Sequence, residues 1–181
     1  MNEREDLRNS SNYYNLEACL FDCVTKSFAR KSTLNAFDFY AIISWKSNRS
    51  ITKVKKGLKS AELTPRALMS KVAECAGDEV RMKVLVEEVA GIGVPIASAI
   101  LTVCYPDRFT ILDYRAWEAL FHFKKVESKS IPVDIGSYFN YLGKCREMAR
   151  EKNMSLRELD HALWGWSKRN SIINLACRKL I

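Results

Sequence analysis

Two glycines separated by a single residue interrupt the most apolar part of the chain, and they constrain its fold more than any other feature. Before Gly91, residues 79–90 place apolar side chains at helical spacing. After Gly93, residues 95–105 are apolar and small, which indicates a buried helix. A glycine has no Cβ atom and tolerates positive φ, so another backbone or a phosphate can approach such a turn closely. Small residues after the turn would let the two helices pack tightly: Ala97, Ser98 and Ala99.

The second helix of this pair is expected to begin near Pro95, with its first N–H groups directed toward the turn. These N–H groups and the positive end of the helix dipole attract anions. The turn therefore has the chemistry of a phosphate site that is independent of base sequence. A Gly-x-Gly turn also joins ordinary core helices, so the turn alone leaves both interpretations open.

The rest of the chain also shows helical patterns and offers no convincing pair of strands. Further helices are predicted over residues 12–30, 36–46, 50–59, 65–76, 114–122, 137–152, 155–168 and 171–180. Capping signals support their boundaries: Asn35, Thr64 before Pro65, Gly77 as a stop, Ser137, and a capping box from Ser155 to Glu158. The chain has only 7 Gly and 4 Pro, too few for the many turns of an all-β fold. We expect an all-α fold that forms one domain over residues 1–181, with two lobes as an option.

The chain carries 29 basic and 21 acidic residues, which gives a formal net charge of +8. This excess favours an anionic partner such as nucleic acid or a membrane surface, but many soluble enzymes are equally basic, so the charge alone does not decide between partners. No apolar run approaches the length of a membrane span, and the first residues, MNEREDLRNSS, are too charged for a signal peptide. We therefore expect no membrane association and a cytoplasmic protein, which in a prokaryote would associate with the nucleoid.

The six cysteines are scattered along the chain, and only two histidines accompany them. No cysteine pair has the C-x-x-C spacing that is typical of zinc and iron–sulfur sites. Several cysteines lie inside apolar runs, as Cys104 does, which favours buried and reduced thiols. The sequence therefore predicts no metal-ligating residues.

The segment that follows the Gly-x-Gly turn narrows the interpretation. A loop leads from Tyr105 through apolar residues to Asp113, and a helix with aromatic side chains comes next. This order of hairpin, small-residue helix, loop, aspartate and aromatic helix resembles the helix-hairpin-helix DNA glycosylase superfamily, which includes the endonuclease-III and adenine-mismatch types. Asp113 stands at the distance from Gly93 that the family shows. The resemblance is specific over residues 89–120 and looser over the rest of 36–168.

The resemblance implies a chemistry for Asp113. Members of the family flip a base out of the duplex, and cleavage of its glycosidic bond builds positive charge on the sugar. The carboxylate of Asp113 would stabilise that charge or activate the attacking water. Asp113 is also placed to cap the helix that starts at Tyr114, and both roles can hold together.

The sequence departs from the family at two places. Bifunctional members place a lysine nucleophile where this chain has Pro95, so no Schiff base can form at that position. The four-cysteine cluster of some members is also absent, because Cys177 stands alone after Cys145. No cofactor is therefore implied, and a monovalent cation at the hairpin is the one ion that the resemblance allows.

The resemblance also assigns contacts to a double-stranded DNA partner. The hairpin would contribute Gly91, Gly93 and Val94. Residues 46–59 are basic with no acid, and in relatives the turn at this place fills the hole left by a flipped base. The contacts expected there are Lys46, Asn48, Arg49 and Lys53, with a solvated face as the alternative. The base pocket would be lined by Trp45, Tyr114 and Trp117, for which core packing is the alternative.

Three functions are compatible with these residues. The first is a monofunctional DNA glycosylase of the base-excision-repair type that uses Asp113. The second is a non-catalytic DNA-binding module of the same fold, which Pro95 favours. The third is a helical adaptor for other proteins, in which the hairpin is only a turn.

Overall fold

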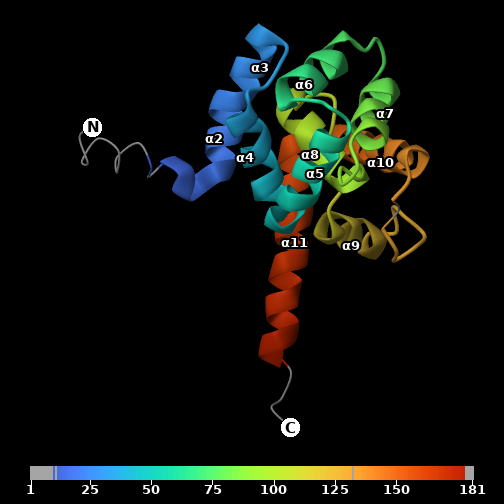
Figure 1. The fold of residues 1–181 in the computed structure, drawn as a ribbon. Helices are drawn as coiled ribbons and strands as arrows, with labels where there is room; N and C mark the ends of the chain where they lie inside the picture. The colour runs from blue at the N-terminus through green and yellow to red at the C-terminus, as the bar shows by residue number, and fades with distance from the viewer. Residues whose placement is uncertain (1–9, 11, 132, 178–181) are drawn as a thin grey trace. The chain divides into compact units, whose positions relative to one another are not determined.

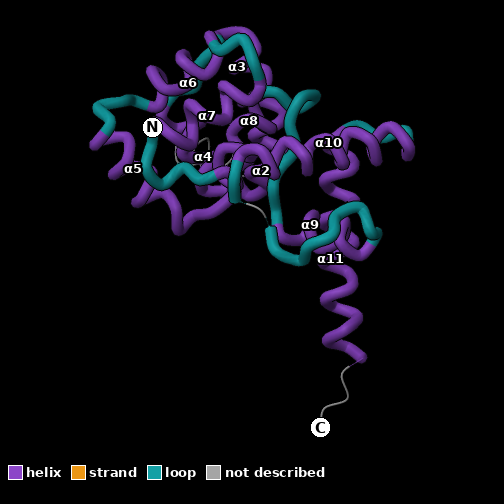
Figure 2. The backbone as a smooth tube through the Cα atoms, turned by 90° about the vertical axis from the view of Figure 1, so that its right-hand side faces the viewer, coloured by secondary structure: helices purple, strands orange, loops and turns teal. Residues whose placement is uncertain are grey.

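The protein is described by a computed structural model that places residues 10, 12–131 and 133–177. Within these ranges every regular element is a helix and no strand occurs, as predicted (Figures 1 and 2). The chain divides into two compact units, unit 1 over Met1–Tyr105 and unit 2 over Pro106–Ile181.

Unit 1 is built around the buried helix that follows the Gly-x-Gly turn. Its helices are α2 (Leu16–Cys19), α3 (Thr25–Lys31), α4 (Ala36–Ser47), α5 (Ile51–Ser60), α6 (Pro65–Glu74), α7 (Asp78–Glu88) and α8 (Val94–Cys104). Shorter turns lie at Asn12–Asn15, Leu20–Val24 and Asn48–Ser50. Every residue of α8 except Pro95 is buried, and α8 packs against α3, α4 and α7. The prediction of a buried helix here is confirmed.

Short polar side chains fix several helix starts in unit 1. The Asn35 side chain accepts a hydrogen bond from the backbone N–H of Asp38 at 2.8 Å, and Thr64 accepts one from Ala67 at 3.1 Å. Both predicted caps are therefore confirmed. Gly77, predicted to end a helix, instead precedes the first residue of α7. The earlier helix ends at Glu74 because Cys75 already has extended backbone angles. The predicted helix over residues 12–30 is divided by a π-helical turn at Leu20–Val24.

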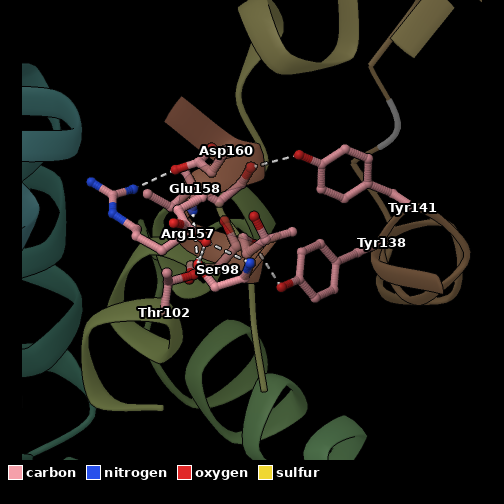
Figure 3. A network of polar contacts seen from close by, with 10 residues as sticks. Ser98, Thr102, Tyr138, Tyr141, Arg157, Glu158 and Asp160 are labelled. Carbon is pink, nitrogen blue, oxygen red and sulfur yellow. Dashed lines mark hydrogen bonds and ion pairs between the residues drawn. The ribbon is translucent and has the colours of Figure 1, made fainter. Parts of the chain in front are cut away.

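Unit 2 contains α9 (Tyr114–His122), α10 (Ile135–Lys152) and α11 (Leu156–Cys177). The segment before α9 is held in place by hydrogen bonds from two side chains of α10. Tyr138 donates its hydroxyl hydrogen to the Thr110 carbonyl at 2.9 Å, and Tyr141 donates to the Ile111 carbonyl at 2.8 Å (Figure 3). Both tyrosines are fully buried, so these bonds satisfy polar groups that water cannot reach.

Two predicted boundaries in unit 2 are wrong. Asp134, not Ser137, caps α10: its carboxylate accepts from the Ser137 N–H at 2.8 Å, which also lowers the pKa of Asp134. The predicted helices 155–168 and 171–180 form one helix through Cys177, and residues 178–180 lie outside the described residues. No glycine or proline breaks the chain between them. The capping box is confirmed, because the Ser155 N–H donates to the Glu158 carboxylate and the Glu158 N–H donates to the Ser155 hydroxyl.

The turn between α7 and α8 lies directly on α5. A Cβ atom on Gly57 would lie 1.9 Å from the carbonyl oxygen of Ala90, and one on Gly91 would lie 2.8 Å from the carbonyl carbon of Lys53. Two glycines, one on each side, thus allow the backbones to touch. Gly91 also has φ +97°, a conformation that favours glycine.

Replacing Gly57 by alanine should destabilise the protein. The added methyl group meets a backbone oxygen that cannot turn aside, so we expect a loss of about 1–3 kcal/mol or more in the free energy of unfolding. Gly143→Ala in α10 is the matched control, since no atom lies within 4 Å of its Cβ position. It should stabilise by about 0.5–1 kcal/mol through helix propensity alone. Urea unfolding measures both, and equal effects would contradict the contact.

Candidate nucleic-acid interface

Two backbone N–H groups at the α7–α8 turn, those of Gly93 and Val94, stand at the start of α8. Gly93 precedes the helix with extended angles, and its carbonyl accepts from Ile96 at 2.9 Å and from Ala97 at 3.0 Å. In the described part of the chain, the N–H groups of Gly93 and Val94 donate to no backbone carbonyl. These are the groups through which helix N-termini bind anions.

The two glycines of the turn have different roles. The space beside Gly91 is occupied by the α5 backbone, so that glycine serves the fold. Gly93 is exposed, and the nearest atom to a Cβ there would be Cδ of Pro95 at 3.8 Å. Its φ of −87° is ordinary, which differs from the positive φ considered for both glycines. Val94 is buried as a whole residue, with 1% of its surface accessible, so Gly93 is the residue of this pair that a ligand can reach.

A lysine-rich helix borders this turn. Four of the six exposed positions of α5 are lysines, and the other two are Thr52 and Ser60, whereas Val54, Gly57 and Leu58 are buried. No acidic residue occurs over residues 46–59. Because the Lys53 backbone touches Gly91, the structure brings together three of the predicted contact residues: Gly91, Gly93 and Lys53. The exposed lysines of α5 are Lys53, Lys55, Lys56 and Lys59.

The turn that is predicted to fill the hole of a flipped base lies at a break between helices, directly before α5. A 3-10 turn at Asn48–Ser50 follows α4, so Lys46 and Arg49 do not continue one helical face to Lys53. Asn48 and Arg49 are exposed, and the Asn48 amide oxygen accepts from the Ser44 hydroxyl at 3.4 Å. Lys46 is half-buried. That Lys46, Asn48 and Arg49 fill the hole of a flipped base stays a prediction.

The three predicted pocket aromatics lie in different surroundings. Trp45 is half-buried and packs edge-on against Phe21, with ring centroids 5.9 Å apart. Trp117 is buried and donates its indole N–H to the Ser128 carbonyl at 2.8 Å, although it also lines a cavity of about 600 Å³. Tyr114 is the exposed member, with 56% of its surface accessible. Tyr114 is therefore the one with a ring open to a ligand.

Asp113 caps α9, as its position in the sequence indicated. Its carboxylate Oδ1 accepts from the Arg115 backbone N–H at 2.9 Å, and its backbone is extended. The residue is half-buried. The cap fixes the direction of the carboxylate, which any catalytic use would require.

Sequence reasoning missed Arg115 and Trp164, which form one group with Tyr114 in unit 2. The guanidinium carbon of Arg115 lies 4.9 Å from the Tyr114 ring centre and 5.2 Å from that of Trp164. Tyr114 and Arg115 begin α9, whereas Trp164 lies on α11. No local pattern links residues so far apart in the chain, so only the packing of α9 on α11 reveals the group.

The thiols provide no metal centre that the structure describes. Burial raises the pKa of the Cys145 thiol to about 12, and it raises that of Cys104 well above its ordinary value. Both thiols are thus protonated and unreactive at neutral pH. Across residues 10, 12–131 and 133–177, no group of three or more His, Cys, Asp or Glu side chains could hold a metal ion. None of the helices described there is long and apolar enough to cross a membrane.

Comparison of the chain with profiles of protein families, with curated proteins and with solved structures found no match. The resemblance to a DNA glycosylase therefore depends on the sequence motifs alone, and most of all on residues 89–120.

The capping role of Asp113 can be separated from its charge. Alanine removes the cap and should lower the free energy of unfolding by about 1 kcal/mol, whereas asparagine caps equally well and should leave it nearly unchanged. Urea unfolding of Asp113→Ala and Asp113→Asn measures the difference. Equal losses in the two variants would show that the negative charge, not the cap, stabilises α9.

Proposed function

We propose that this protein grips the backbone of double-stranded DNA with the α7–α8 turn and acts as a monofunctional DNA glycosylase. The observation that supports it best is the start of α8, where Gly93 is exposed, beside the α5 lysines. There, two N–H groups without backbone partners adjoin a helix with four outward lysines and no acid. Backbone N–H groups and lysines are the usual contacts to phosphate.

Asp113 supplies the carboxylate that hydrolysis of a glycosidic bond needs. Positive charge develops on the sugar as the bond to the base breaks, and a fixed carboxylate stabilises that charge or takes a proton from the attacking water. The Arg115 N–H holds the Asp113 carboxylate in one orientation before any substrate arrives. Hydrolysis then releases the free base and leaves an abasic sugar.

Pro95 supports a second candidate, a DNA-binding module of the same fold without catalysis. Its ring nitrogen is part of the backbone and carries no hydrogen, so it cannot form an imine with the sugar. Proline fits the first turn of α8. The substitution therefore removes lysine chemistry at this position without disturbing the helix.

Binding to duplex DNA should depend steeply on salt and on Gly93. Each phosphate that the protein neutralises adds about 0.9 to the slope of log affinity against log salt. Gly93→Glu puts a carboxylate beside the phosphate and should weaken binding to every sequence by about tenfold or more. Gly77→Glu is the matched control: it makes the same charge change at the start of α7, where a Cβ meets only Val80 at 3.7 Å.

Fluorescence anisotropy with a labelled duplex measures both variants over a salt series. The proposal expects the control to bind nearly as the wild-type protein does. An affinity that is flat with salt, or an equal loss in the two variants, would contradict a phosphate grip at the hairpin.

The glycosylase and the non-catalytic module differ in base release. A panel of duplexes, each with one modified base, should yield abasic sites with the wild-type protein, whereas Asp113→Asn should bind the same duplexes and release no base. Borohydride should trap no covalent adduct, because Pro95 offers no amine. Binding without any release across the panel would favour the module, and an efficient adduct lost in Lys46→Ala would show a lysine nucleophile at another position.

A further inference from the structure

Tyr114, Arg115 and Trp164, here called the aromatic–arginine stack, form an exposed group on unit 2. Tyr114 is 56% exposed and Trp164 is 44% exposed. The guanidinium of Arg115 lies over both rings, at 4.9 Å and 5.2 Å from their centres. Large aromatic rings at a surface cost hydrophobic free energy, and their π faces bind other flat groups.

Hydroxyl groups of α11 hold the arginine in place. Nη1 of Arg115 donates to the hydroxyls of Ser167 and Ser171, each at 3.4 Å. The Ser167 hydroxyl in turn donates to the Glu118 carboxylate, and the Ser171 hydroxyl donates to the Ser167 carbonyl. The stack is thus built into α9 and α11, so little ordering entropy remains to be lost on binding.

The surroundings of the stack suit an anion with a flat ring. No acidic residue occurs in α11 from His161 to Cys177, and Lys168 and Arg169 are exposed. Two carboxylates lie near the stack, and both are engaged in hydrogen bonds: Asp113 accepts from the Arg115 backbone N–H, and Glu118 accepts from the Ser167 hydroxyl. A cavity of about 460 Å³ opens beside Tyr114, and its volume is typical of small-ligand pockets. Its other lining residues are Glu118, Phe121, Lys129 and Ile131.

We propose that the aromatic–arginine stack holds an unpaired nucleotide. The base stacks on the Tyr114 and Trp164 rings, while Arg115 and the cations of α11 attract its phosphate. Stacking of this kind needs a free π face, which a paired base inside a duplex does not offer, and it tolerates every base. The inference rests on the proposed function and narrows its substrate to DNA in which a nucleotide already lies outside the helix.

The test compares two duplexes of equal length, one intact and one with a single unpaired nucleotide. The wild-type protein should bind the unpaired-nucleotide duplex more tightly. Tyr114→Leu and Trp164→Leu should each reduce that preference about tenfold, toward a ratio of one. Tyr114→Phe keeps the ring and should retain the preference for the unpaired-nucleotide duplex. Tyr14→Leu is the matched control, because Tyr14 is 98% exposed on unit 1, away from the stack in the chain.

The outcomes separate this inference from the proposed function. A salt-dependent wild-type affinity for the intact duplex that Gly93→Glu reduces, with no preference for the unpaired nucleotide, would overturn the stack and leave the duplex grip standing. Absence of binding to both duplexes would overturn both. An unchanged preference in Tyr114→Leu and Trp164→Leu would also overturn the assignment of the stack to an unpaired nucleotide. A dimer that sedimentation detects in the wild-type protein and not in these variants would overturn it too, because the rings would then contact a second copy of this chain.

Discussion

The contact between α5 and the α7–α8 turn, backbone against backbone, is the interaction on which the candidate interface depends. Gly57 and Gly91 each omit the Cβ atom that would force the two elements apart. Their contact places the Lys53 backbone against the turn and commits one glycine of the turn to packing. Gly93 is exposed and has free space beside it, at the start of a helix whose side chains are almost all buried.

The features that the sequence predicts well are those with local causes. Asn35, Thr64 and the Ser155–Glu158 box each act within three residues, and each forms the expected bond. The burial of α8 follows from its unbroken apolar composition. Even so, a local rule chose Ser137 as the cap of α10, because the sequence could not show that the helix begins earlier, after Asp134.

Features that depend on tertiary packing escaped prediction. Gly57 is a residue of low helix propensity within a basic helix, and only its contact with the Ala90 carbonyl explains why a glycine stands there. Arg115 and Trp164 meet through the packing of α9 on α11, which no periodicity encodes. The same holds for Trp117, whose buried indole bonds to Ser128 in a loop. Asp113 could be singled out from the sequence because its spacing from Gly93 and its place before the helix at Tyr114 are both local signals.

The central claim is that the backbone N–H groups at the start of α8 bind a DNA phosphate. Amide chemical shifts of the ¹⁵N-labelled protein, followed while a short duplex is added, test it most directly. The account predicts that the signals of Gly93 and Val94 shift most at low salt, together with those of α5 around Lys53, and that added salt reverses the change. Binding of the duplex with the Gly93 and Val94 signals unmoved would contradict the account.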